Sequence, residues 1–214
     1  MKIRRLGLVA YEPTWHAMQA FTQARGAQTP DELWLLQHPP VFTLGLAGRE
    51  AHVLAPGAIP VVRTDRGGQV TYHGPGQLVA YPLVDLRRLG MGVKELVRRL
   101  EESVLGVVAG YALPGERIAG RPGVYVGGRK IAAVGLRVAR GCSYHGLALN
   151  VDLALEPFAR IDPCGYPGLE STSLAALGVR DSIEAVQQRL AAALLRAFAG
   201  EAVPAGVPNL LGLS

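Results

Sequence analysis

Apolar residues follow two patterns along the chain, short runs typical of strands and a three-to-four-residue spacing typical of amphipathic helices. The expected strands are 33–36, 41–44, 60–63, 78–84, 123–126, 130–138 and 144–151. The expected helices cover 14–25, 93–105 and 183–198. Strand-like and helical segments alternate with no repeat or linker, so the sequence predicts one mixed α/β domain spanning 1–214.

Turn and cap signals mark where these elements begin and end. Two prolines, Pro39 and Pro40, separate the first two strands, and Gly127 with Gly128 connects a predicted hairpin between 123–126 and 130–138. Asp181 and Glu184 have the spacing of a capping box ahead of the last helix. We assign no element to 204–214, which is rich in proline and glycine.

Composition excludes several classes of protein. With 49% hydrophobic and 18% charged residues, the chain is not intrinsically disordered. It contains no apolar run near the roughly 20 residues of a membrane span, and 1–6 lacks the apolar stretch of a secretion signal. Two cysteines are too few for a disulfide framework. We therefore expect a cytoplasmic protein that does not associate with membranes.

The net charge of +5 comes from 22 basic and 17 acidic residues and favours an acidic partner. Nucleic acid is one candidate. However, the sequence has no long basic cluster interleaved with aromatic residues and no recognisable reading helix or zinc finger. An acidic protein is therefore the preferred partner over nucleic acid.

The segment 66–77 places four glycines, Arg66 and His73 between two predicted strands. It lacks the Lys-Ser/Thr pair of a phosphate-binding loop and the third glycine of a dinucleotide fingerprint, so it does not support ATP or NAD binding. Glycines allow the backbone to approach a ligand closely, and the strand-like stretch 69–72 would line a slot suited to an extended acyl chain. A purely structural turn is the alternative interpretation.

Lys130 opens an apolar strand, and simple alternation places it on one face with Ala132, Val134 and Leu136. Burial would disfavour its charged form and lower its pKa, which makes a lysine a usable base near neutral pH. The alternative is a strand-end lysine whose amine reaches water. Its residue type and position leave both interpretations open.

Either cysteine could be a nucleophile. Cys164 lies in a turn with two prolines and two glycines, where packing alone seldom places a cysteine, and Cys142 is its competitor. A zinc site is disfavoured because the Cys142–His145 spacing has no second ligand pair. His73 and His145 lie beside glycines and have no evident carboxylate partner, so the sequence supports no histidine triad. His16, His38 and His52 are expected to be structural or to face solvent.

Six blocks taken together resemble the lipoyl/octanoyl transferase family. The blocks are QHPPVFTLG (37–45), RGGQVTYHGPGQ (66–77), GVYV (123–126), KI with GLR (130–131 and 135–137), HGLALN (145–150) and PCG (163–165). They occur in the family's order, which makes a chance match very unlikely. The resemblance implies an α/β domain with a mixed sheet flanked by helices, similar to the catalytic domains of biotin protein ligases and lipoate ligases.

The resemblance also implies the reaction. It is the transfer of an octanoyl or lipoyl group from acyl carrier protein to a lysine of a lipoyl domain, which is the first step of endogenous protein lipoylation. The acceptors would be the E2 subunits of 2-oxoacid dehydrogenases and the H protein of glycine cleavage. No cofactor is implied beyond the phosphopantetheine of the carrier protein, and we expect a monomer without metal.

The family pattern also assigns roles to residues. Cys164 becomes the nucleophile, Lys130 the base and His145 a supporting residue. The role of Arg66 is read from its place at the start of the glycine segment: it orders that segment through backbone carbonyls, meets the acidic donor, or is an ordinary surface arginine. The implied substrate slot consists of Arg66, Gly67, Gly68, Gln69, Val70, Thr71, Tyr72, His73, Ala133, Val134, Gly135, Gly146, Leu147 and Ala148.

Two other functions remain to be weighed. An ATP-dependent lipoate ligase shares the fold and a lysine but needs no cysteine, so the block 163–165 argues against it. A binding module for lipoyl domains without catalysis would need the slot but neither Cys164 nor Lys130, and both are present.

Overall fold

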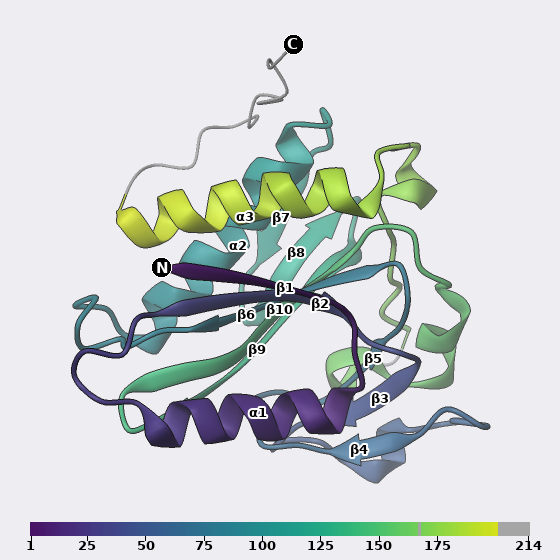
Figure 1. Cartoon of the computed structure of the whole chain (residues 1–214). Helices are drawn as coiled ribbons and strands as arrows, with labels where there is room; N and C mark the ends of the chain where they lie inside the picture. The colour runs from purple at the N-terminus through teal and green to yellow at the C-terminus, as the bar shows by residue number, and fades with distance from the viewer. Residues whose placement is uncertain (167, 201–214) are drawn as a thin grey trace.

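The computed structural model describes residues 1–166 and 168–200, except for the side chain of Cys164. These residues form two sheets and three long helices (Figure 1). The segment 204–214, for which no element was expected, lies outside the described residues.

The larger sheet has seven strands in the order β1-β2-β6-β10-β9-β8-β7. Its strands are β1 (Lys2–Leu8), β2 (Glu32–Gln37), β6 (Gln77–Leu83), β7 (Gly115–Ile118), β8 (Arg121–Val126), β9 (Arg129–Ala139) and β10 (Cys142–Asn150). β1 pairs with β2 in parallel, and every other pair is antiparallel. The predicted mixed sheet and the 123–138 hairpin, which forms β8 and β9, are therefore confirmed.

The smaller sheet has three strands in the order β4-β3-β5. They are β3 (Val41–Leu44), β4 (Val61–Arg63) and β5 (Val70–His73). β2 and β3 are separated by only three residues, yet they belong to different sheets. The prolines at 39 and 40 end the first strand and turn the chain toward the second sheet.

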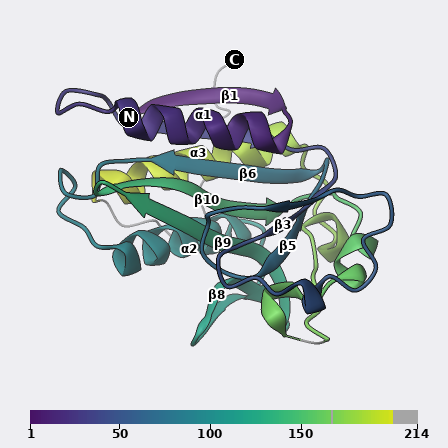
Figure 2. The same cartoon turned by 90° about the horizontal axis from the view of Figure 1, so that it is seen from below.

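Helices cover both faces of the larger sheet. Their bounds are α1 (Tyr11–Ala24), α2 (Val93–Ala109) and α3 (Ile183–Ala199). In Figure 1, α2 and α3 lie on one face, whereas α1 and the smaller sheet lie on the other. α1 packs against β10 of the larger sheet, and Figure 2 shows this side of the molecule from below. The main apolar core fills the space between α2, α3 and the sheet.

One helix start and one helix cap differ from the sequence prediction, whereas α3 begins at residue 183 as expected. α1 begins at Tyr11 rather than at residue 14. The cap of α3 is Ser182, whose hydroxyl accepts a hydrogen bond from the Ala185 amide, so the expected capping box at Asp181 is wrong. The Asp181 carboxylate instead accepts a hydrogen bond from the Tyr111 hydroxyl. Serine and aspartate cap helices about equally well, so the sequence alone did not distinguish the adjacent candidates.

The two edge strands, β1 and β7, had no sequence signal. β1 carries Lys2, Arg4 and Arg5 and is largely exposed, and β7 is a four-residue strand without a fully buried side chain. These strands are stabilised by backbone hydrogen bonds to β2 and β8, and they carry no apolar pattern that the sequence could reveal. Charged, short edge strands also hinder pairing with a second molecule.

Short 3₁₀ helices occupy several of the connections, and one of them contains a candidate site residue. They are η1 (Glu50–His52), η2 (Glu156–Arg160), η3 (Pro163–Gly165) and η4 (Ala175–Leu177). The backbone of η3 contains Cys164.

Candidate functional site

A pocket lies between the seven-stranded sheet and the glycine segment that precedes β5, and we call it the slot. Its empty volume is about 500 Å³, including the open mouth. The lining residues are Tyr11, Arg66, Gly68, Gln69, Val70, Thr71, His73, Val79, Tyr81, Ala133, Val134, Gly135, His145, Gly146, Leu147 and Ala148. Segments from α1, β5, β6, β9 and β10 therefore meet around one cavity.

The structure brings most of the expected slot residues to this cavity, and two lie outside its lining. The Gly67 amide donates to the Leu136 carbonyl at 2.8 Å, which fastens the glycine segment to β9. Tyr72 points into a separate apolar cluster and packs edge-to-face on Phe158, with ring centroids 5.5 Å apart. Alternation along β5 explains this, because Thr71 and His73 face the slot and Tyr72 faces away.

Small residues form the floor of the slot. Ala133 on β9 lies opposite Ala148 on β10, and Gly135 lies opposite Gly146. A Cβ atom built on Gly135 would come within 3.1 Å of the Gly67 carbonyl oxygen. Because Gly135 has no side chain, the backbone of the glycine segment can approach β9 closely.

Arg66 is 7% exposed and holds the glycine segment in place. Its guanidinium donates to the Gly67 carbonyl at 2.9 Å, to the Gln69 carbonyl at 2.7 Å and to the Thr43 carbonyl at 2.6 Å. Of the roles considered for Arg66, these hydrogen bonds support the ordering of the loop.

Four aromatic rings close one side of the slot, and we call them the ring wall: Tyr11, His73, Tyr81 and His145. Tyr11 lies almost parallel to His73 and to His145, with ring centroids 5.8 Å and 6.5 Å apart. Sequence reasoning missed Tyr11 and Tyr81, together with Val79 on the floor. Tyr11 comes from a helix more than fifty residues before the glycine segment, and no local pattern connects the two.

His145 has a carboxylate partner that the sequence did not reveal. Its Nε2 donates to Asp65 at 2.9 Å, and the adjacent Tyr144 hydroxyl donates to the same carboxylate. Consecutive strand residues normally point to opposite faces, but His145 has a positive φ of 57°, which turns both side chains toward Asp65. The available signal was an acidic residue directly before Arg66.

Burial and hydrogen bonds together set the ionisation of Asp65, His145 and Tyr144. Burial alone would raise the pKa of Asp65, but hydrogen bonds from His145, Tyr144 and Gln19 outweigh it and hold that pKa well below its ordinary value. Burial lowers the pKa of His145 against the opposing effect of Asp65. Burial and the Asp65 hydrogen bond raise the pKa of Tyr144 to about 12. The pair at neutral pH is therefore a neutral imidazole and a carboxylate.

Two further histidines are buried beside the slot and neutral. Burial lowers the pKa of His38 to about 4 and that of His73 to about 3. His38 Nδ1 donates to the Val9 carbonyl at 2.7 Å, and its Nε2 accepts from the Tyr81 hydroxyl at 2.8 Å. His38 is thus structural, as expected, and it fixes a ring of the wall.

Lys130 is 5% exposed, and its position corrects one expectation. Between β8 and β9 the register advances by one residue on β8 and by two on β9, so Ile131 is the extra residue of a bulge. Ile131 and Ala132 both pack into the core beneath α2 and α3. Alternation across the bulge is therefore broken, and the expected shared face of Lys130 and Ala132 is wrong.

The bulge turns Lys130 toward the face that carries the slot. A Cβ built on Gly123, opposite Ala133, would lie 2.8 Å from Lys130 Cε and 3.4 Å from its Nζ. The Nζ also lies 5.3 Å from the centre of the Tyr125 ring. The Lys130 backbone pairs with 170–172, a segment that follows the Cys164 turn.

The Cys164 turn lies beside the slot. Gly165 packs near the side chain of Gln69, because a Cβ built there would be 3.3 Å from Gln69 Cγ. Asp162, directly before η3, accepts a hydrogen bond from His52 Nδ1 at 3.0 Å, and its backbone amide donates to the His52 carbonyl at 2.9 Å. His52 is therefore structural, as expected. The Cys164 side chain is outside the described part of the structure.

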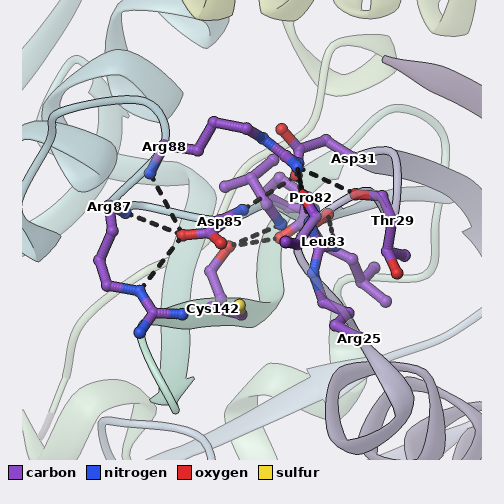
Figure 3. Close-up of polar contacts among 12 residues, drawn as sticks. Arg25, Thr29, Asp31, Pro82, Leu83, Asp85, Arg87, Arg88 and Cys142 are labelled. Carbon is purple, nitrogen blue, oxygen red and sulfur yellow. Dashed lines mark hydrogen bonds and ion pairs between the residues drawn. The ribbon is translucent and has the colours of Figure 1, made fainter.

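Cys142 lies at the opposite end of the β9–β10 hairpin from Lys130. Cys142 is 4% exposed. Its backbone pairs with Ala139 on β9 and forms an isolated antiparallel β-bridge with Asp85. Figure 3 shows it beside Asp85 and Arg87, within an ion-pair network that fastens the neighbouring loops. Cys142 is therefore buried and far from Lys130 along the hairpin, a fact that the local sequence did not reveal.

Within residues 1–166 and 168–200, no three His, Cys, Asp or Glu side chains come together as a metal site. In the same ranges, no helix has both the length and the apolar character needed to cross a bilayer. His16 is exposed on α1 and is not a slot residue.

Comparison with known proteins gives a consistent result. Residues 10–195 match the family described as the lipoyl protein ligase A/B catalytic domain. An octanoyltransferase of Alkalilimnicola ehrlichii is 60% identical over 198 residues, covering 92% of this chain and 92% of that protein.

Solved structures share the fold at low identity. Lipoate-protein ligase A bound with ATP aligns with a TM-score of 0.71 and 16% identity, covering 94% of this chain and 85% of that chain. A biotin protein ligase from Aquifex aeolicus aligns with a TM-score of 0.54 and 11% identity, covering 94% and 70%. The predicted likeness to both ligase folds is confirmed.

Proposed function

Because this chain belongs to the lipoyl protein ligase A/B family, among its octanoyltransferases, we propose that it transfers an octanoyl group to a lysine of lipoyl domains. The donor is octanoyl-acyl carrier protein, and the acceptors are the E2 subunits of 2-oxoacid dehydrogenases and the glycine cleavage H protein. The same slot serves a lipoyl group. The chain acts as one catalytic domain and requires neither ATP nor a metal.

One observation carries this proposal beyond the family name. The slot is floored by alanine and glycine and lies beside both the turn that contains Cys164 and the buried Lys130. Such a cavity suits an apolar acyl chain, and the turn offers a nucleophile at its mouth. A ligase that activates its acid with ATP would not need that cysteine.

In the first step, Cys164 Sγ attacks the thioester carbonyl of the donor, and its proton passes to Lys130 Nζ. The tetrahedral intermediate then expels the pantetheine sulfur, which takes the proton back from Lys130. One thioester breaks as another forms, so the free-energy change is small. Backbone amides of the turn stabilise the oxyanion.

In the second step, the ε-amine of the lipoyl-domain lysine attacks the Cys164 thioester. An amide bond forms, the carbon–sulfur bond breaks, and the amine proton passes to the cysteine sulfur, with Lys130 as relay. The amide is much more stable than the thioester, and this drives transfer forward. The products are an octanoylated domain, the free carrier thiol and unchanged enzyme.

The test is a reconstitution without ATP. The protein is mixed with octanoyl-acyl carrier protein and an apo lipoyl domain, and the mass of the domain is followed. Wild type and Cys142→Ser should both add one octanoyl group, whereas Cys164→Ser should lose transfer, since a hydroxyl is a far weaker nucleophile at neutral pH. Transfer that requires ATP, or that survives in Cys164→Ser, would contradict the proposal.

A further inference from the structure

Two buried amide side chains, Gln77 and Asn150, end two of the family blocks, and neither of them lines the slot. They lie opposite each other on β6 and β10. Gln77 Nε2 donates to Asn150 Oδ1 at 3.0 Å and to the Tyr72 carbonyl at 3.1 Å. Because Nε2 faces these two acceptors, the orientation of the Gln77 amide is defined.

A short stretch of chain, 170–174, joins the start of β9 to the end of β10, and we call it the bridging segment. On the β9 side, the Lys130 amide donates to the Glu170 carbonyl, and the Thr172 amide donates to the Lys130 carbonyl, each at 2.9 Å. The position of the Lys130 backbone therefore depends on the position of the bridging segment.

Asn150 holds the bridging segment from the β10 side by two hydrogen bonds. Its side-chain Nδ2 donates to the Thr172 carbonyl at 2.8 Å, and its backbone carbonyl accepts from the Leu174 amide at 3.0 Å. Thr172 is fully buried. Removing the Asn150 amide would therefore leave the Thr172 carbonyl with no water to replace the lost donor, which is costly.

The hydrogen bonds run in one direction from the slot to Lys130. His73 lines the slot, and its Nδ1 donates to Gln77 Oε1 at 2.7 Å. Gln77 donates to Asn150, and Asn150 donates to the Thr172 carbonyl. The Thr172 amide then donates to the Lys130 carbonyl. Each group in this buried chain accepts one hydrogen bond and donates the next, so the orientation of one amide fixes that of its neighbour.

We propose that Asn150 is a positioning residue for Lys130 and that Gln77 orients it. The pair holds the bridging segment, and through that segment it holds the Lys130 amine in place for proton transfer. This inference rests on the proposed function, in which Lys130 exchanges a proton with Cys164. It predicts that Asn150 affects the chemical step more than it affects donor binding.

The first measurement is the pH dependence of Cys164 alkylation without substrate, on a Cys142→Ser background that leaves one thiol. Lys130→Ala should raise the pH midpoint of alkylation by about one unit or more, because a nearby ammonium stabilises the thiolate. Asn150→Ala should raise the midpoint in the same direction. The double variant should show no further rise beyond Lys130→Ala, because Asn150 acts through Lys130. A residue that only stabilised the fold would not move this midpoint.

The second measurement is transfer from octanoyl-acyl carrier protein. Asn150→Ala should lower kcat by about 10- to 100-fold with little change in KM, since a catalytic group displaced by about 1 Å can cost about 10²-fold in rate. Gln77→Met keeps the hydrogen bond from Asn150 to Thr172 and should have a smaller effect in the same direction.

Ser143→Ala is the matched control. It removes another buried side chain of β10 that donates to a backbone carbonyl, that of Pro82 at 2.7 Å, and it lies outside the chain of hydrogen bonds that leads to Lys130. It should leave both kcat and the alkylation midpoint unchanged.

If Asn150→Ala does not fold, Gln77→Met carries the same test. Wild type that transfers no octanoyl group would overturn the proposed function, and the alkylation measurement, which needs no donor, would still decide the inference. An alkylation midpoint that stays at the wild-type value in the folded Asn150 or Gln77 variant, or that shifts equally with and without Lys130, would overturn this inference alone.

Discussion

The two faces of the seven-stranded sheet bury side chains of different chemistry. Beneath α2 and α3, the core cluster consists of Leu, Val, Ile and Ala with one Phe. Two buried polar side chains of α2 each bond to backbone, Glu101 to the Gly123 amide and Ser103 to the Arg99 carbonyl. On the other face, beneath α1 and the smaller sheet, three histidines and Arg66 are buried around a cavity.

The difference indicates that one face of the sheet mainly stabilises the fold and that the other mainly forms a binding cavity. The helix face excludes water with apolar side chains, which is the main source of folding free energy. The slot face gives up packing for an opening floored by Ala and Gly, and each polar ring needs a designated partner. Substitutions on the two faces should therefore fail in different ways.

The largest effect is expected at Lys130. Lys130→Arg should lower kcat/KM for transfer by about 10²- to 10⁴-fold, as removal of a general base typically does, because guanidinium keeps the charge but cannot accept a proton. Kinetics with octanoyl-acyl carrier protein measure this, with the exposed neighbour Arg129→Lys as control. If Lys130 only supplied a fixed charge, the arginine variant would keep substantial activity and an unchanged pH profile of Cys164 alkylation.

A second prediction contrasts the two faces directly. Leu100→Ala on α2 removes a fully buried side chain and should lower the free energy of unfolding by about 2–5 kcal/mol, with little change in KM. Gly135→Ala places a methyl group 3.1 Å from the Gly67 carbonyl and should instead raise KM for the octanoyl donor. Denaturant titrations and transfer kinetics of both variants measure this. Equal KM effects from the two would contradict the division between faces.

The third prediction concerns pH and the slot face alone. His38 and His73 have folded-state pKa values of about 4 and about 3, against 6.5 ordinarily. Below pH 6.5 the unfolded chain gains protons that the folded protein does not, so stability should fall as pH falls from 6.5 toward 4. Well below pH 6.5 the slope approaches about 1.4 kcal/mol per pH unit for each histidine, its maximum for one proton.

Urea titrations between pH 7 and 5 test this slope. His73→Asn removes one of the two groups and should give a shallower slope than wild type. Identical slopes would show that His73 is not buried and neutral in the folded protein.

The smallest effect is expected from salt. Arg49 and Arg129 lie near the Cys164 turn. The Arg49 backbone amide donates a hydrogen bond to the Gln69 side chain, and Arg129 lines a surface pocket together with Pro163. The ion pairs among the described residues include neither arginine. They should attract an acidic carrier protein. Raising salt from about 50 to 150 mM should lower kcat/KM a few-fold, and Arg129→Ala should weaken that dependence. A rate independent of salt would contradict this steering.

The sequence predicted most of the elements because their apolar residues are buried at regular spacing. It did not predict the edge strands β1 and β7, whose stability comes from backbone pairing. It placed the glycine segment at the slot through the family blocks. It could not orient Lys130, since a bulge at Ile131 reverses the face and leaves no compositional mark.

The two tyrosines of the ring wall and the carboxylate partner of His145 were beyond sequence reasoning for a related reason. Tyr11, Tyr81 and Asp65 come from separate segments and meet only after the sheets pack. The positive φ of His145, which turns it toward Asp65, is also rare outside glycine and has no local signal. Packing between distant segments therefore decides these parts of the site.

The most direct test of the account is the intact mass of the protein after incubation with octanoyl-acyl carrier protein and no acceptor. We predict the addition of one octanoyl group, located at Cys164 by peptide mapping, absent from Cys164→Ser and removed when an apo lipoyl domain is added. An unmodified protein that still transfers octanoyl to the domain, or an adduct on Cys142, would contradict the account.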